Sequence, residues 1–171
     1  MLVVAFTVPA SAVEHKFGGY WRTRFVTYKN FDGTDGTSRT EVNTRTRLYY
    51  TAVLHDNLKF VNKFEMDATW GGQGGTDYGR IDADRIAVEV KNTYADFNLW
   101  NLNWNVGTQG FQWGRSGFLF DTDASGIKVI YRGADNFVPA FYWIRAYDGE
   151  KAAGDDGQDV DYYTALVNYK S

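Results

Sequence analysis

Hydrophobic and polar residues alternate along most of this chain. In the stretch TRTRLYYTAVLHDNLKFVNKFEM, residues 44–66, an alternating run is followed by the short segment HDN and then by a second alternating run. A period of two is typical of a β-strand, because successive side chains point to opposite faces of the sheet. The stretch therefore predicts two antiparallel strands joined by a tight turn at residues 55–57.

The same alternation recurs along the chain, without a convincing helical pattern, and predicts about eight strands. The predicted strands are residues 16–28, 43–54, 58–69, 85–97, 102–111, 124–132, 137–147 and 159–170. Most are roughly ten residues or longer, which is the length that a tilted strand needs to cross a bilayer.

The segments between the predicted strands alternate in length. The short ones are residues 55–57, 98–101 and 133–136, and the long ones, rich in glycine and acidic residues, are 31–41, 71–83, 112–124 and 148–159. Outer-membrane β-barrels have long outer loops and short periplasmic turns. The pattern therefore favours a barrel of that class.

Each predicted strand has an apolar face and a polar or charged face. Leu48 and Tyr50 alternate with Arg47 and Tyr49, for example. A soluble sandwich would bury the apolar face, whereas a membrane barrel would turn it to lipid and the cations to a wet lumen, and alternation alone allows both. Strand length and the aromatic residues near strand ends favour the membrane barrel.

We therefore predict an all-β fold, an antiparallel up-and-down transmembrane β-barrel. The side chains expected to face lipid are Leu48, Tyr50, Leu54, Phe60, Phe64, Met66, Ile127 and Val129. The side chains expected to line the lumen are Arg22, Arg24, Arg45, Arg47, Lys59, Lys63, Glu65, Asp67, Glu89, Lys91, Lys128 and Arg132. Cations outnumber carboxylates in the second set, so it indicates either a path that favours anions or charges that pair across strands within the wall.

The N-terminus resembles a secretion signal. An apolar run at residues 2–8 precedes Ala10, Ser11 and Ala12, the small-residue pattern of a signal-peptidase site. We expect a signal peptide at residues 1–12 whose basic start is truncated, followed by the barrel at 13–171. An ordinary buried strand is the alternative for this segment.

Composition and net charge argue against several classes of function. The net charge is −3 and the isoelectric point is near 5.3, so there is no basic surface excess of the kind that nucleic-acid-binding domains show. The chain has no cysteine, which excludes disulfides, cysteine-ligated zinc and thiol catalysis.

Catalytic and metal-binding patterns are lacking. His15 and His55 are the only histidines, and neither belongs to a recognisable motif. The acidic segments 32–36 and 121–123 lack the spacing of an EF-hand, although acidic loops can hold calcium. We therefore predict a protein that is not an enzyme and has no cofactor or resident metal.

The segment YADFNLWNLNWNVGTQGFQWGRSGFLFDTDASGIKVIYRG, residues 94–133, resembles alginate-export-like outer-membrane barrels and related porins. The matching positions are Val106, Gly107, Gln109, Phe111, Trp113, Gly114, Arg115, Asp121, Asp123, Gly126, Ile127, Lys128 and Val129. The resemblance implies a passive pore or export channel. Such barrels are longer than this chain, and its last residues, TALVNYKS, lack the terminal Phe or Trp of a complete barrel, so we expect an N-terminal part of a larger ring.

The leading functional hypothesis is an outer-membrane porin or export channel of a Gram-negative bacterium. It would pass small polar or anionic solutes, including anionic saccharides, by diffusion through a lumen rich in Arg and Lys. Its partners would be membrane lipid and these solutes, with a homo-oligomer left open. The alternatives are a complete eight-stranded structural or adhesive barrel and a soluble lipocalin-like binder of an apolar ligand, in which the apolar faces point inward.

Overall fold

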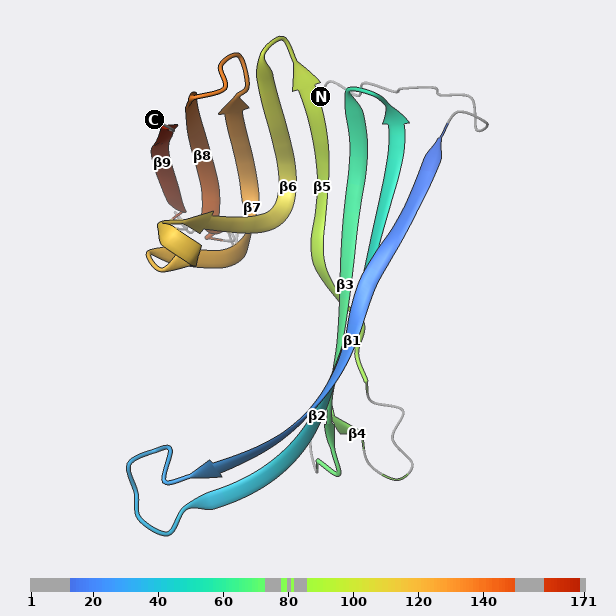
Figure 1. Cartoon of the computed structure of the whole chain (residues 1–171), viewed down its shortest axis with the longest axis vertical. Coiled ribbons are helices and arrows are strands. Elements are labelled where there is room, and N and C mark those ends of the chain that lie inside the picture. The colour runs from blue at the N-terminus through green and yellow to red at the C-terminus, as the bar shows by residue number, and fades with distance from the viewer. Residues whose placement is uncertain (1–12, 73–77, 80, 82–85, 150–158, 170–171) are drawn as a thin grey trace. The chain divides into compact units, whose positions relative to one another are not determined.

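The computed structural model describes residues 13–72, 78–79, 81, 86–149 and 159–169. Its strands all belong to one β-sheet (Figure 1). The strands are β1 (Glu14–Lys29), β2 (Ser38–His55), β3 (Leu58–Trp70), β4 (Tyr78–Gly79), β5 (Glu89–Leu99), β6 (Leu102–Trp113), β7 (Phe120–Tyr131), β8 (Phe137–Tyr147) and β9 (Val160–Tyr169). The expected signal peptide lies outside the described residues.

The order of the strands in the sheet follows the chain. The hydrogen-bonded path runs β1-β2-β3-β5-β6-β7-β8-β9, and β4 pairs with β3 off this path. Because each long strand lies antiparallel to its neighbour in sequence, the arrangement is up-and-down. The prediction of an all-β, antiparallel, up-and-down fold with about eight strands is thus confirmed, while a closed ring and a membrane span stay predictions.

Two compact units share these strands. Unit 1 contains the described parts of Met1–Lys16, Tyr50–Asn62 and Lys91–Ser171, and unit 2 contains Phe17–Tyr49 and the described parts of Lys63–Val90. The long strands β2 and β3 contribute residues to both units.

Most strand boundaries lie close to the sequence prediction, but β5 begins at Glu89 rather than at residue 85 and β7 at Phe120 rather than at residue 124. β2 begins at Ser38 rather than at residue 43, because the amide of Asn30 donates to the carbonyl of Thr37 at 2.7 Å and closes the hairpin nearer its tip. The two-residue strand β4 and a 3-10 turn at Arg115–Gly117 lie in long connections and were not predicted. Among the residues described, no helix has both the length and the apolar composition that a membrane span requires.

Two glycines lie opposite one another in unit 1, at positions where a side chain would collide with a neighbouring strand. Gly107 on β6 lies directly opposite Gly126 on β7, and β6 bends strongly along its length (Figure 1). A Cβ at Gly126 would lie 2.1 Å from the carbonyl oxygen of Trp143 and 3.0 Å from the ring of Phe111. The absence of a side chain at Gly126 therefore makes room for Phe111, which is completely buried.

Candidate functional site

The register of β5 to β9 separates polar from apolar side chains in unit 1. One row on one face contains Asp96, Asn105, Lys128, Tyr142 and Thr164. The two neighbouring rows, on the other face, contain Phe97, Trp104, Val129, Phe141 and Ala165, and Ala95, Val106, Ile127, Trp143 and Tyr163. Ile127 and Val129 therefore lie within an apolar face, which we call the apolar face of unit 1.

Two charged residues of the polar row, Asp96 and Lys128, contact residues outside the row. The Lys59 ammonium lies 3.0 Å from Oδ2 of Asp96. The ammonium of Lys128 lies 4.8 Å from the centre of the Phe111 ring and donates to the carbonyl of Gly110. Phe111 and Ile144 are buried on this same face, so a small apolar core adjoins the polar row.

The apolar face of unit 1 is exposed. Phe141 is 45% exposed and Tyr163 is 67% exposed. All the described strands belong to a single sheet, so no second sheet of the described residues covers this face. A continuous exposed apolar surface of this kind marks a site that contacts lipid, protein or an apolar ligand.

Unit 2 carries a compact group of ion pairs, the arginine–carboxylate cluster of Arg45, Arg47, Glu65 and Asp67. Arg45 reaches Asp67 with Nε at 2.7 Å and Nη2 at 2.5 Å, and its Nη2 lies 3.1 Å from Glu65. Arg47 pairs with Glu65 through its Nε. Glu65 is only 6% exposed, so one nearly buried carboxylate is shared by two guanidinium groups.

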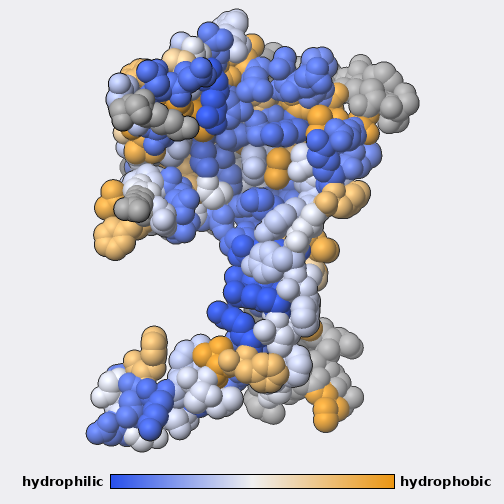
Figure 2. Space-filling view, viewed as in Figure 1, coloured by the Kyte–Doolittle hydropathy of each residue, from blue (hydrophilic) through white to orange (hydrophobic). Residues whose placement is uncertain are grey.

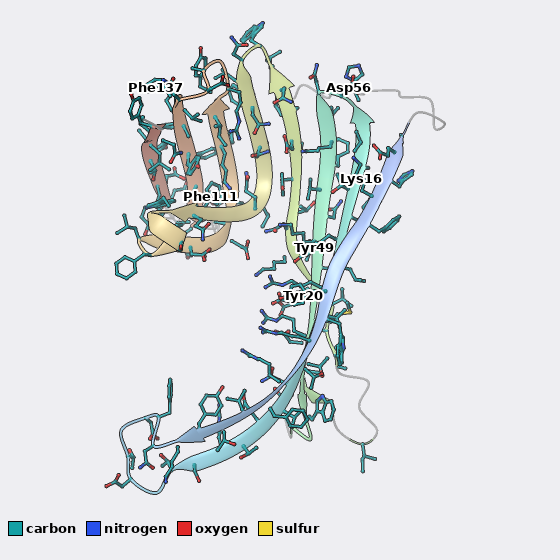
Figure 3. The ribbon with its side chains drawn as sticks, in the orientation of Figure 1. Lys16, Tyr20, Tyr49, Asp56, Phe111 and Phe137 are labelled. Carbon is teal, nitrogen blue, oxygen red and sulfur yellow. The ribbon has the colours of Figure 1, made fainter. Side chains whose placement is uncertain are left out.

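Two tyrosine rings of unit 2, those of Tyr20 and Tyr49, lie close to cations, and both tyrosines are labelled in Figure 3. The guanidinium of Arg47 lies 5.5 Å from the centre of the Tyr20 ring, and the ammonium of Lys63 lies 5.5 Å from the centre of the Tyr49 ring. Both distances suit cation–π attraction. Tyr20, Arg47, Tyr49 and Lys63 therefore share one face of β1, β2 and β3.

A cleft of about 260 Å³ lies in unit 2 beside the cluster and is lined in part by Arg22, Arg24, Asn43, Arg45 and Asp67. We call it the basic cleft. Nε of Arg24 donates to Oδ1 of Asn43 at 3.2 Å, whereas Nε of Arg22 is buried and has no hydrogen-bond partner in the described part of the chain. Three guanidinium groups beside one carboxylate leave the cleft with net positive charge, which suits an anionic group.

The opposite face of unit 2 is apolar and exposed. On β1, Phe17 is 81% exposed and Phe25 is 76% exposed, and both alternate with the arginines of the basic cleft; Leu48 on β2 is 52% exposed. Figure 2 shows hydrophilic residues gathered over much of the surface in view, with hydrophobic residues mainly towards its margins. Of the other residues expected to face lipid, Phe60 is exposed, and Tyr50, Leu54, Phe64, Met66, Ile127 and Val129 are half-buried.

Three of the residues expected to line the lumen lie at or near strand ends. Lys91 pairs with Asp123 at 2.6 Å, and the same carboxylate accepts a hydrogen bond from Nδ2 of the buried Asn92, the next residue on β5. Glu89 is the first residue of β5 and is exposed. Arg132 follows the last residue of β7 and is exposed as well.

Two carboxylates were missing from the charges counted in the sequence. Asp96 neutralises Lys59, and Asp123 neutralises Lys91, so the excess of cations is smaller than predicted. The position of Asp96 could have been deduced, because the tight turn at Trp100–Asn101 pairs Leu99 with Leu102 and hence Asp96 with Asn105. The position of Asp123 depends on a long connection and could not have been deduced in this way.

Both histidines lie near strand ends. Nδ1 of His15 lies 2.8 Å from the Tyr50 hydroxyl, and His55 is the last residue of β2, where its Nδ1 accepts a hydrogen bond from the amide of Asn57. Within the described ranges there is no group of three or more His, Asp or Glu residues that could hold a metal ion. In the acidic hairpin loop, hydrogen bonds from the Thr37 hydroxyl and the Thr34 amide lower the pKa of Asp32 below its usual value.

The distinguishing geometry is therefore a sheet with a charged face, including the basic cleft, and an apolar face that no second sheet of the described residues covers. Comparison with known proteins adds no assignment, because no family model matches the chain and no curated protein or solved structure matches it.

Proposed function

We propose that this chain forms the wall of a transmembrane β-barrel in the outer membrane of a Gram-negative bacterium. Its charged face would line a water-filled pore or export channel for small polar or anionic solutes, including anionic saccharides. The observation that supports the proposal is the division of one sheet into a charged face and an exposed apolar face, as far as the described residues extend. The resemblance of residues 94–133 to alginate-export-like barrels implies the same function.

The exposed apolar side chains support a lipid-facing surface. Phe17, Phe25 and Leu48 would each lose contact with water in a bilayer, and burial of such side chains contributes about 1.5 to 3 kcal/mol each. A soluble lipocalin-like binder would instead gather these side chains around a ligand inside the molecule. Their exposure of more than half favours lipid over that alternative.

In a lipid environment, the backbone groups along both edges of the sheet need hydrogen-bond partners. Hydrocarbon offers no partners for backbone N–H and C=O groups, so a spanning sheet must pair every edge. Within the described residues, the path of the sheet ends at β1 on one side and β9 on the other. In the proposed barrel these edges pair either with one another, which gives a small barrel, or with further strands, which gives the larger ring expected from the sequence.

The basic cleft accounts for the proposed preference for anions. Arg45, Arg47 and Lys59 are paired with carboxylates, so they contribute little net charge to a pore. Arg24 bonds to a neutral amide, and Arg22 has a buried Nε without a partner among the described residues. Rings of Arg and Lys bias a pore towards anions, so Arg22 and Arg24 should set this preference.

Arg24→Ser should therefore lower the permeability of chloride relative to potassium about twofold, as a screened positive charge is removed from the lumen wall. The measurement is the reversal potential in planar lipid bilayers under a potassium chloride gradient. Arg39→Ser is the matched control, because its guanidinium lies over Tyr28 near the hairpin end and is 72% exposed. An equal shift in both variants, or no shift in either, would contradict the role given to the basic cleft.

A small structural or adhesive barrel is the second candidate, and the ion pairing favours it. The arginine–carboxylate cluster and the buried Phe111 and Ile144 fill space on the charged face, and an eight-stranded barrel is only wide enough for its side chains. The same bilayer recordings separate the two functions. A protein that inserts, remains folded and carries no steady current would support the structural barrel and overturn the pore.

A further inference from the structure

The far end of the β6–β7 hairpin leaves the sheet. β6 and β7 stay paired with each other as far as Trp113 and Phe120. The pairing of β6 with β5 ends at Thr108, however, and the pairing of β7 with β8 begins only at Ser125, directly opposite Thr108. Residues 109–124 therefore project from the sheet without ladder pairing to the described strands on either side (Figure 1). We call this segment the hairpin arm.

The hairpin arm folds back over the charged face of unit 1. Asn105 on β6 and Tyr142 on β8 both lie opposite Lys128 of β7, in the polar row. Trp113 follows Asn105 by eight residues, a separation of about 26 Å in a straight strand. The centre of the Trp113 ring nevertheless lies only 6.3 Å from the centre of the Tyr142 ring. Only an arm that turns back across the charged face brings these two rings together.

The base of the arm is fixed to this face by packing and by a charged hydrogen bond. Phe111 is completely buried, and the centre of its ring lies 5.9 Å from that of Tyr142. The ammonium of Lys128 donates a hydrogen bond to the carbonyl of Gly110 in the arm. Hydrogen bonds from a charged donor are stronger than those between neutral groups. The arm is therefore held against the charged face and does not only connect two strands.

The tip of the arm is apolar and exposed. Phe118 is 90% exposed and Leu119 is 71% exposed, and they lie between the 3-10 turn at Arg115–Gly117 and β7. Just before the tip, the stacked rings of Trp113 and Phe120 have centres 3.8 Å apart. Because the arm folds back, it carries this apolar tip to the side of the sheet on which the charged face lies.

We infer that the hairpin arm narrows the lumen of the proposed pore and that Phe118 and Leu119 form an apolar constriction in it. The inference rests on the proposed function, because the arm constricts a lumen only if the charged face encloses water. Apolar constrictions resist wetting, so hydrated ions and large solutes pass them slowly. The arm therefore limits the size of the solutes, whereas the basic cleft sets the preference for their charge.

Chemical modification of the tip tests this inference, because the chain has no cysteine of its own. Phe118→Cys in the full chain is recorded in planar lipid bilayers while a bulky, water-soluble methanethiosulfonate reagent is added. Modification should lower the single-channel current by about half, since the added group fills the constriction. Phe31→Cys is the matched control, because Phe31 is 85% exposed and lies in the loop between β1 and β2, outside the arm. An unchanged current in modified Phe118→Cys, or an equal loss in both variants, would overturn the inference and leave the pore intact.

A second variant widens the constriction instead of blocking it. The double variant Phe118→Ala, Leu119→Ala removes two exposed side chains, so it should insert and fold as the wild type does. It should raise the single-channel conductance about twofold and admit larger neutral polyethylene glycols. Unchanged conductance and an unchanged size limit would overturn the inference alone. A wild type that inserts without carrying current would overturn both the constriction and the pore.

Discussion

Glu65→Ala is expected to lower the free energy of unfolding by about 2 to 3 kcal/mol, because removal of one member of a buried ion pair leaves the other charge without compensation. Glu65 is nearly buried and is shared by Arg45 and Arg47. Arg45 keeps Asp67, whereas Arg47 loses the carboxylate that its Nε contacts. Urea unfolding in detergent micelles, followed by tryptophan fluorescence, measures the change.

Glu14→Ala is the matched control for this experiment. Glu14 pairs with Lys16 at 3.3 Å on β1, but both side chains are more than half exposed. Exposed pairs contribute at most about 1 kcal/mol, so this variant should unfold close to the wild type. Equal, small effects of Glu65→Ala and Glu14→Ala would mean that water screens the arginine–carboxylate cluster and that it does not stabilise unit 2.

Gly126→Ala is expected to destabilise the protein by about 3 kcal/mol or to prevent folding, because a methyl group added to a filled site forces the backbone to move. The new Cβ would lie 2.1 Å from the carbonyl oxygen of Trp143 and 3.1 Å from Cα of Ile144. Both atoms belong to β8, so relief of the contact requires β7 and β8 to separate. Refolding yield and urea unfolding measure the effect.

Gly18→Ala on β1 provides the comparison. A Cβ at Gly18 would meet Tyr49 at 3.8 Å, an ordinary van der Waals contact. Alanine at a compatible position often stabilises slightly, because it restricts the unfolded chain. We expect Gly18→Ala to fold normally. Gly126→Ala with wild-type stability would contradict the close approach of β7 and β8 and the packing of Phe111 over the glycine.

The strand content of the fold was predictable because alternation with a period of two is strong in this chain. The segment 137–147 was predicted with both boundaries correct, and the turn between His55 and Leu58 was placed correctly. The start of β2 was missed because it depends on hydrogen bonding between Asn30 and Thr37 in the loop. Such a contact has no counterpart in a hydrophobicity pattern.

The residues of the charged face were only partly predictable. Alternation placed Arg45 and Arg47 together, but their pairing with Glu65 and Asp67 depends on the register between β2 and β3. Lys91 was expected in the lumen, and its pairing with Asp123 of β7 was not predicted. The register of β5 could not be followed through the long connection before it, and a shift of one residue exchanges the faces of a strand.

The central claim is that the apolar face of the sheet contacts lipid and the charged face contacts water. Two adjacent residues of β2 test it most directly. Leu48→Cys and Tyr49→Cys, each labelled with the same small fluorophore in vesicles, place the probe on opposite faces of β2. We expect brominated lipid to quench the probe at residue 48 but not at 49, and aqueous iodide to quench the probe at 49 but not at 48. Quenching of both probes by iodide alone, or of residue 49 by lipid, would contradict the claim.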